Sequence, residues 1–401
     1  MRSDAHNSGV CNPPAIVLGL SPTGLYAVRE LGRAGIQVFG VSDGNSVARG
    51  SRFLSEALTV NNPEDCLGWL LRRFEKCHAK PILVPTSDAF VEFIANRHLE
   101  LSACFEIPDG LQLGLALDFL DKSRFYAICE AHGVAYPKIV VAKPDELASV
   151  SDLIDFPCMI KPAKIHTIKH AMAGSKGWIA KDLAQYRDVI RRIPSNAGEL
   201  LVQEIVPGPE SEITLYCAAF DKAGSPREAF TARKLRQYPP GFGSASLVQS
   251  HPEPETRELA EDLLGRIGFH GIAAAEFKRD ARTGVLKIIE INPRPSLWFS
   301  VSSAAGKHVV LAQYEDLTGI PMGLTEREQS NGVRWCYTLK DLYTRIAYAR
   351  GAASVLPRPD PETVGPASSR TYAVFSGDDP VPAFGELSHL AGRALKRLKR
   401  P

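Results

Sequence analysis

Apolar residues near the start of the chain fall into short continuous runs, which are separated by stretches with helical spacing. The first elements predicted in this way are a strand, a helix and a strand, at residues 15–20, 25–33 and 36–41. The alternation continues with a helix, a strand and a helix, at residues 63–77, 81–84 and 89–96. This order predicts βαβ units and hence an N-terminal α/β domain.

The turn after the first predicted strand is bracketed by Gly19 and Gly24. The spacing is not G-x-G-x-x-G, so a dinucleotide site is the minor hypothesis and a tight turn that needs glycine is the main one. Asp88 follows a later strand, at the sheet edge where ligands of open α/β sheets bind. We expect Asp88 to cap the next helix rather than to bind a ligand.

Two apolar runs in the second half of the chain predict a β-hairpin. They are Gly271–Phe277 and Val285–Ile291, and the segment Lys278–Gly284 between them ends in glycine. The acids Glu276 and Glu290 interrupt these runs. Ionised carboxylates are rarely buried without a cation or another partner, so the two acids need an explanation.

Pairing of the two strands around the predicted turn brings Glu276 close to Glu290. Side chains alternate along a strand, so Glu290 and Asn292 share one face. Two carboxylates and an amide oxygen suit Mg²⁺, with Mn²⁺ as the alternative ion. Arg294 offers a forked donor for phosphate or carboxylate. The simpler interpretation is an ordinary hairpin whose acids pair with Lys or Arg.

Lys161 ends the apolar run that begins at Phe156, and its ammonium is costly there unless it meets an anion. Gly174 and Ser175 then begin a flexible turn whose backbone N–H groups could cradle phosphate oxygens. The segment before this turn is unusually basic, and it offers three candidates for contact with an acidic substrate, Lys164, Lys169 and His170.

The spacing of Glu276, Glu290, Asn292 and Arg294 resembles the metal-binding end of the ATP-grasp superfamily. Biotin carboxylase, D-alanine–D-alanine ligase and the carbamoyl phosphate synthetase large chain belong to this superfamily. The resemblance covers roughly residues 15–320 and implies an α/β protein, with α+β character in the nucleotide domain. The implied order is a Rossmann-like domain, a small ATP-grasp subdomain, a large subdomain and a C-terminal extension, at residues 1–118, 119–198, 199–325 and 326–401.

The resemblance also implies which residues bind ATP. Lys122, at the start of a predicted helix, and Lys161 would contact phosphates, and the loop at Gly174 and Ser175 would close over the triphosphate. A hinge made of Gln203, Glu204 and Val206 would bind adenine through backbone groups. Glu212 would hold the ribose hydroxyls, and Glu210 is the less favoured choice.

A basic stretch with Arg233, Lys234 and Arg236 accompanies a predicted strand. The superfamily uses basic residues here near the γ-phosphate and the acceptor substrate, so the resemblance implies that Lys234 and Arg236 bind phosphate or carboxylate. The alternative is an exposed cationic strand edge, which protects a sheet against aggregation.

The chemistry implied by the resemblance begins when ATP phosphorylates a carboxylate. A nucleophile then displaces phosphate from the acylphosphate, and Arg294 would stabilise the acylphosphate or the tetrahedral intermediate. We expect a ligase that joins a small-molecule carboxylate to an amine and releases ADP and phosphate. Two alternatives remain, a biotin-carboxylase-like subunit with a separate carrier and a non-catalytic ATP-binding regulatory protein.

Composition limits the class of protein, its partners and its compartment. The chain has 401 residues, 44% hydrophobic and 23% charged, which is typical of a soluble globular protein, and its net charge of +2 does not favour nucleic acid. No apolar run is long enough to span a membrane, and eight scattered cysteines without a C-x-x-C pair predict reduced thiols in the cytoplasm. The end, Leu387–Pro401, predicts a basic amphipathic helix, either a solvated face or, as the lesser alternative, a contact with an anionic membrane. A homodimer is left open.

Overall fold

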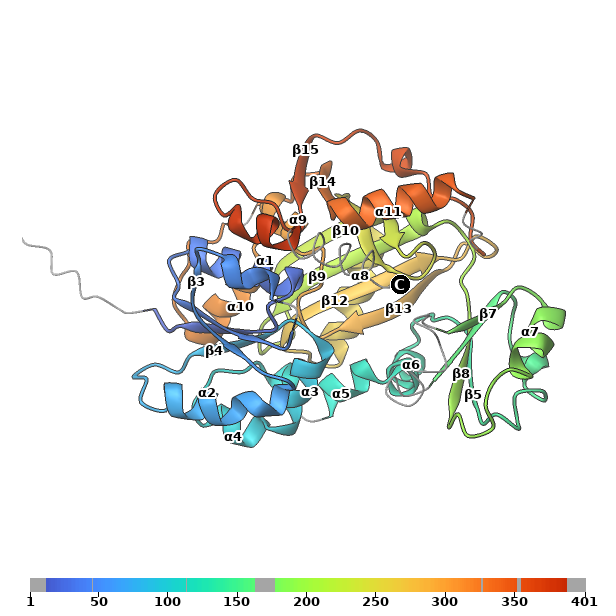
Figure 1. Ribbon diagram of the computed structural model, residues 1–401, viewed down its shortest axis with the longest axis horizontal. Coiled ribbons are helices and arrows are strands. Elements are labelled where there is room, and N and C mark those ends of the chain that lie inside the picture. The colour runs from blue at the N-terminus through green and yellow to red at the C-terminus, as the bar shows by residue number, and fades with distance from the viewer. Residues whose placement is uncertain are drawn as a thin grey trace, which may run out of the picture.

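The computed structural model describes residues 12–44, 46–112, 114–162, 177–325, 327–351 and 355–387. Three sheets and the helices that cover them make up this part of the chain (Figure 1). None of the helices in the described residues is long and apolar enough to cross a membrane.

The first sheet forms the N-terminal domain, coloured blue in Figure 1. Its four strands are all parallel, in the order β3-β2-β1-β4. They are β1 (Ala15–Leu18), β2 (Val38–Ser42), β3 (Leu54–Thr59) and β4 (Ile82–Pro85). The helices are α1 (Pro22–Arg33), α2 (Leu67–Phe74), α3 (Asp88–Asn96) and α4 (His98–Ser102). Helix α1 packs on one face of the sheet, and α2 and α3 pack on the other, so the predicted α/β domain is confirmed.

The turn between β1 and α1 depends on its two glycines. Gly19 has a φ of +98°, a conformation that L side chains rarely adopt. A Cβ at Gly24 would lie only 1.9 Å from the carbonyl oxygen of Gly19. The hypothesis of a tight turn that needs glycine is therefore confirmed.

The second sheet lies at the opposite side of Figure 1 from the N-terminal domain. It is antiparallel, with the order β5-β8-β6-β7. Its strands are β5 (Ile139–Ala142), β6 (Cys158–Pro162), β7 (Trp178–Ala180) and β8 (Leu200–Glu204). Helix α7 (Leu183–Ile190) packs against it, and α5 (Leu115–Leu120) and α6 (Lys122–Ala131) precede it in the chain. Asp121 caps α6 by accepting hydrogen bonds from the backbone N–H groups of Ser123 and Arg124, at 2.9 and 3.2 Å.

The third sheet is the largest and occupies the centre of Figure 1. Its order is β13-β12-β9-β10-β11-β14-β15. The strands are β9 (Ile213–Phe220), β10 (Pro226–Tyr238), β11 (Ser244–Ser250), β12 (Gly271–Arg279), β13 (Leu286–Asn292), β14 (Val333–Cys336) and β15 (Ser369–Tyr372). The helices around it are α8 (Pro254–Arg266), α9 (Ser300–Ala304), α10 (Val309–Thr318) and α11 (Thr338–Ala349). Short 3₁₀ helices lie at Val47–Gly50, Pro63–Cys66, Asp109–Leu111, Ser151–Leu153, Glu210–Glu212 and Pro361–Val364.

Alternate side chains of the large sheet enter two different cores. On one face, Leu215 and Ala274 belong to a core shared with α10 and with α1 of the N-terminal domain. On the other face, Tyr216 and Ala275 pack with α6 and α8. The first face is apolar over most of its length and becomes charged near Glu276, which is where the candidate site lies.

Two strands of the predicted C-terminal extension, β14 and β15, complete the large sheet. Strand β14 pairs with β11, and β15 pairs with β14 in parallel. Helix α11 contacts β10 and β11. Residues beyond 326 are therefore built into the same sheet as the predicted nucleotide subdomain.

The replacement Gly24→Ala tests the turn between β1 and α1. We expect it to lower the free energy of unfolding by about 1–3 kcal/mol, because the added Cβ would overlap the Gly19 carbonyl oxygen. Gly265→Ala, within helix α8, is the matched control, since a Cβ there would meet the carbonyl oxygen of Gly224 at 3.6 Å, an ordinary van der Waals contact. The control should be neutral or stabilise by about 0.5–1 kcal/mol. Urea unfolding measures both, and an unchanged Gly24→Ala protein would contradict the steric assignment.

Candidate active site

The two acids of the hairpin lie directly opposite each other. In the register of β12 and β13, Glu276 pairs with Glu290 and Ala274 pairs with Asn292. Directly opposed residues share a face of the sheet, with Cβ atoms about 5 Å apart. The predicted hairpin, and the expectation that it brings Glu276 beside Glu290, are confirmed.

A lysine from another element compensates each acid. Lys234, on β10, places its Nζ 2.5 Å from Oε2 of Glu276, and only 4% of the Lys234 side chain is exposed. Lys122, at the start of α6, places its Nζ 3.2 Å from Oε2 of Glu290. The simpler interpretation of the hairpin, acids paired with lysines, therefore describes these contacts, but the two lysines are themselves predicted ligand-binding residues.

Asn292 and Arg294 continue the polar row. Asn292 Nδ2 donates to Oε1 of Glu290 at 3.2 Å, and a terminal nitrogen of Arg294 donates to Oδ1 of Asn292 at 3.2 Å. Arg294 Nε donates to Oδ1 of Asp88 at 2.7 Å. The expectation that Asp88 caps a helix is wrong, because α3 begins at Asp88 itself, after Ser87 in the cap position. The Asp88 carboxylate instead joins the N-terminal domain to the row of site residues.

Lys161 and Lys122 are connected through a partly buried chain of hydrogen bonds. Lys161 Nζ donates to Oε1 of Gln203 at 2.6 Å, and Gln203 Nε2 donates to the Tyr126 hydroxyl at 2.9 Å. Tyr126 donates to the Ile289 carbonyl at 2.9 Å, and Lys122 Nζ reaches the same carbonyl at 3.2 Å. Burial raises the pKa of Tyr126, so the phenol stays neutral and can donate. Sequence reasoning missed Tyr126, whose only signal is its place one helical turn after Lys122.

Part of the predicted phosphate-binding segment is not among the residues that the structure describes. Outside the described residues lie the glycine-rich turn and the basic stretch before it, with Lys164, Lys169, His170, Gly174 and Ser175.

The tip of the hairpin holds the predicted hinge. Lys278 Nζ donates to the Val206 carbonyl at 2.7 Å, and burial lowers the pKa of Lys278 to about 8. The Glu204 carboxylate, only 1% exposed, pairs with Lys287 at 2.9 Å and with Arg282. It also accepts a hydrogen bond from the backbone N–H of Lys138 at 3.0 Å. The Glu204 side chain is thus occupied by contacts within the protein, and the prediction for the hinge concerns its backbone groups.

Asp280 completes this cluster at the hairpin tip. It is fully buried and lies 2.9 Å from Arg282 and 3.0 Å from Lys287. The hydrogen bond from Arg282 holds the pKa of the Asp280 carboxyl well below its usual range. Two acids and two cations therefore balance one another where the hairpin meets the hinge. None of this was predicted, because only the fold brings residue 204 to residues 280–287.

The two candidate ribose acids have different surroundings. Glu212 is partly exposed and lies 3.8 Å from a terminal nitrogen of Arg233. Glu210 is fully buried and accepts hydrogen bonds from the backbone N–H of Gln237 at 3.1 Å and from the Tyr348 hydroxyl at 2.7 Å. Glu210 therefore serves the fold, which agrees with the preference for Glu212.

The basic stretch of β10 divides between the two faces of the sheet. Arg233 Nε donates to Glu253, next to α8, at 2.7 Å, whereas Lys234 points to Glu276 on the opposite face. Arg236 forms a two-pronged pair with Asp341 of α11, at 2.7 and 2.8 Å. The three cations are thus not one cluster, and the alternative of a merely solvated strand edge is wrong, because all three side chains are ion-paired and largely buried.

Hard oxygen donors are available for a divalent cation in the form of Glu276, Glu290 and Asn292. Among the described residues, no group of three or more His, Cys, Asp or Glu side chains could hold a metal ion. Two carboxylates and an amide oxygen nevertheless fit Mg²⁺, which keeps several waters and is usually shared with substrate phosphates. The donor set therefore fits the predicted ion.

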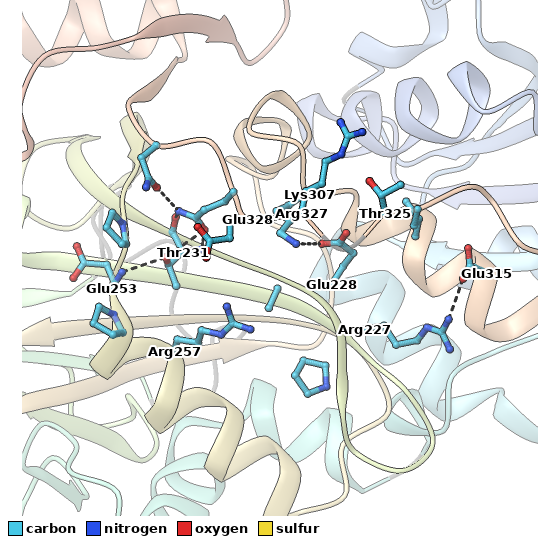
Figure 2. A pocket seen from close by; sticks show the side chains of 17 residues that line it. Arg227, Glu228, Thr231, Glu253, Arg257, Lys307, Glu315, Thr325, Arg327 and Glu328 are labelled. Atoms are coloured by element: carbon cyan, nitrogen blue, oxygen red, sulfur yellow. Dashed lines mark hydrogen bonds and ion pairs between the residues drawn. The ribbon is translucent and has the colours of Figure 1, made fainter.

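A separate cavity of about 760 Å³ lies between the start of β10, the start of α8 and residues 324–325 and 327–331 (Figure 2). Ion pairs cross its wall, with Lys307 3.0 Å from Glu228 and Arg227 3.0 Å from Glu315. None of the predicted site residues lines this cavity. It is therefore distinct from the row of acids and lysines described above.

Comparison with known sequences gives distant relatives. No family model matches the chain. D-aspartate ligase from Enterococcus faecium is 25% identical over 232 residues, which cover 55% of each chain. The carbamoyl phosphate synthase large chain of Xylella fastidiosa is 26% identical over 253 residues, which cover 60% of this chain and 21% of that protein. The match thus spans about half or less of these relatives.

Solved structures resemble most of the chain. An ADP complex of N5-carboxyaminoimidazole ribonucleotide synthetase has a TM-score of 0.60 at 13% identity, covering 79% of each chain. The biotin carboxylase domain of 2-oxoglutarate carboxylase from Hydrogenobacter thermophilus, bound to MgADP, ADP and bicarbonate, has a TM-score of 0.59 at 17% identity, covering 80% of this chain and 73% of that one. L-amino acid ligase from Bacillus licheniformis has a TM-score of 0.55 at 13% identity, covering 80% and 78%. The chain has the ATP-grasp fold, as the sequence predicted.

The replacement Asp280→Asn tests the buried cluster at the hairpin tip. It leaves Arg282 and Lys287 undercompensated, and we expect a loss of about 3 kcal/mol in the free energy of unfolding at neutral pH. The folded-state pKa is depressed, so the contribution of Asp280 is present above its unfolded pKa of about 4 and is lost as the pH falls. Urea unfolding between neutral and acidic pH should therefore give a smaller decline for the variant. Parallel curves for the two proteins would contradict the ion-pair assignment.

Proposed function

We propose that this protein is an ATP-dependent ligase that activates a carboxylate as an acylphosphate and joins it to an amine, releasing ADP and phosphate. The observation that carries the proposal is the opposed pair Glu276 and Glu290, each beside a lysine, on an ATP-grasp fold. Ligases and carboxylases both occur among the similar proteins, and one sequence relative, matched over 55% of its length, is D-aspartate ligase.

The nucleotide would lie between the small sheet and the large sheet. The ammonium groups of Lys122 and Lys161 would bind its phosphates. The hydrogen-bond chain through Gln203 and Tyr126 fixes the positions of these two groups relative to each other. Backbone groups of the hinge around Val206 would bind the adenine. Lys278 holds that hinge in place, because its ammonium donates a hydrogen bond to the Val206 carbonyl.

Mg²⁺, or Mn²⁺ in its place, would be held by Glu276, Glu290 and Asn292. The ion would supply charge neutralisation between the β- and γ-phosphates. Glu276 and Glu290 are the ion-pair partners of Lys234 and Lys122. With a cation held by the two carboxylates, both lysines could contact phosphate oxygens, while Lys122 also keeps its hydrogen bond to the Ile289 carbonyl. The acids and lysines therefore pair with one another in the protein alone, and the same side chains could bind a cation and phosphates.

The acceptor carboxylate would meet Arg294. This guanidinium is oriented by Asp88 and Asn292, so its fork is held in place before a substrate arrives. An oriented cation near the γ-phosphate can bring two anions together and then stabilise the negative charge that develops on the acyl oxygen when the amine attacks. Arg236, oriented by Asp341, is the second candidate for this task.

The cysteines are compatible with a reducing compartment, and we place the activity in the cytoplasm. All seven cysteines in the described residues are free thiols. Several are core residues; burial raises the pKa of Cys129 and of Cys158 to about 12, so both stay protonated and unreactive.

Isotope transfer tests the type of reaction. ADP release is first screened with pairs of amino acids, D-aspartate included, and with bicarbonate. For an active pair, ¹⁸O in the carboxylate should appear in the released phosphate, because the γ-phosphate is transferred to a carboxylate oxygen that later leaves with it. Mass spectrometry of the phosphate measures this. Turnover driven by bicarbonate alone would replace the ligase by a carboxylase, and no ADP release under any condition would leave only an ATP-binding protein.

The replacements Glu276→Gln and Glu290→Gln test the metal site. Each removes one charge from the donor set, and we expect kcat for ADP release to fall on the order of 100-fold or more. Glu255→Gln is the matched control, because Glu255 pairs with Arg279 on the exposed surface and belongs to no predicted site. Circular dichroism shows whether all three variants fold. Wild-type ADP release in either site variant would refute the assignment.

A further inference from the structure

Lys278 of β12 is a buried cation that no acid pairs with among the described residues. Only 4% of Lys278 is exposed. Its Nζ donates one hydrogen bond, of 2.7 Å, to the carbonyl oxygen of Val206, and the part of the chain that the structure describes offers it no second partner. An ammonium carries three N–H donors, and buried charges are normally paired or fully hydrogen-bonded. The contacts within the protein therefore use only one of the three donors of Lys278.

The acids near Lys278 are bound to other groups. Glu210, Glu212 and Asp280 lie close enough to favour its charged form. Glu210 and Asp280 are held by contacts within the fold, as described above. Glu212 is partly exposed and lies 3.8 Å from Arg233. The three carboxylates thus stabilise the charge of Lys278 without accepting its hydrogen bonds.

Strand β12 places Lys278 between the candidate metal site and the hinge. Lys278 comes two residues after Glu276, so both side chains lie on the same face of the strand, about 7 Å apart along it. In the register of the sheet, Lys278 lies opposite Ile213, which directly follows the candidate ribose acid Glu212. Its ammonium reaches the hinge at Val206. A nucleotide that extends from the hinge past Glu212 to the metal-binding acids would therefore contact Lys278.

The hinge backbone offers few groups to a base. The N–H of Ile205 donates to the Pro157 carbonyl at 2.8 Å, Pro207 has no N–H, and the Pro207 carbonyl accepts from the N–H of Ala281 at 3.3 Å. Within the described residues, the Ile205 carbonyl and the N–H of Val206, which is only 4% exposed, have no partner. These two groups belong to one trans peptide unit and point in opposite directions. Only one of them can face a base, so a second hydrogen bond has to come from a side chain.

We propose that the ammonium of Lys278 donates a hydrogen bond to a ring nitrogen of the adenine of ATP, which makes Lys278 a base-recognition residue. The inference rests on the proposed binding of ATP between the small and large sheets. Adenine carries ring nitrogens that accept hydrogen bonds beside an amino group that donates them, so a charged donor next to the hinge matches its edge. The buried side chains that pack with Ile205, Met159 and Leu356, are apolar and cannot supply this bond.

Calorimetric binding of ADP and its deaza analogues, with Mg²⁺ present, tests the contact without turnover. In 1-deaza-, 3-deaza- and 7-deaza-ADP, a C–H group replaces one ring nitrogen in turn. For the wild type, we expect one of the three analogues to bind about tenfold or more weakly than ADP, because a bond from a charged donor is lost. Lys278→Met should lose about as much affinity for ADP, and it should bind that same analogue no more weakly than ADP.

Lys307→Met is the matched control, because it makes the same change at another largely buried lysine. The Lys307 side chain is 14% exposed and lies 3.0 Å from Glu228, in the wall of the separate cavity. This variant should bind ADP and every analogue as the wild type does. Circular dichroism shows whether both variants fold.

Two results would overturn the proposal. If the wild type binds all three deaza analogues as tightly as ADP, or if Lys278→Met keeps the same loss for the sensitive analogue, Lys278 only holds the hinge. If the loss in Lys278→Met is coupled instead to 2′-deoxy- or 3′-deoxy-ADP, the contact is to the ribose. A wild type that binds ADP but releases none from ATP would refute the ligase and leave the Lys278 assignment standing, whereas a wild type that binds no adenine nucleotide would refute both.

Discussion

Charge compensation at one end of the large sheet is the constraint on which the site depends. Glu276 and Glu290 face each other across two strands, and like charges at that separation repel. Lys234 and Lys122 offset the repulsion, and they come from β10 and α6, on two sides of the hairpin. A slip of one residue in either strand would turn its acid into the apolar core on the other face, so the register of the sheet and the position of α6 are fixed by the same requirement.

The hairpin that carries the acids also fixes the hinge. Lys278, on its strand β12, donates a hydrogen bond to the Val206 carbonyl, and Arg282, at its tip, forms an ion pair with Glu204. The hinge and the acids are thus positioned by one stiff, two-stranded element rather than by separate loops. The distance between the base end and the metal end of a bound nucleotide would then be set by the backbone of β12.

Periodicity and local chemistry were sufficient to predict the features that depend on residues close together in the sequence. The hairpin, the pairing of its acids and the glycine turn after β1 could all be predicted, because strand alternation and turn sterics are local. The partners of Arg236 and Glu210 could not. Their contacts are with Asp341 and Tyr348, more than a hundred residues away, and a polar residue on an amphipathic helix carries no sign of which strand it will meet.

These long-range contacts connect the C-terminal extension to residues of the candidate site. Asp341 engages Nε and one terminal nitrogen of Arg236, and this pairing leaves the other terminal nitrogen outside it. A guanidinium held in this way keeps a donor and a fixed direction, whereas a free arginine on a strand end would lose rotamer entropy on every binding event. Tyr348 does the equivalent for Glu210, which in turn holds the backbone of Gln237. Helix α11 therefore sets the end of β10, the strand that also carries Lys234, and removing it would loosen the site without removing a single site residue.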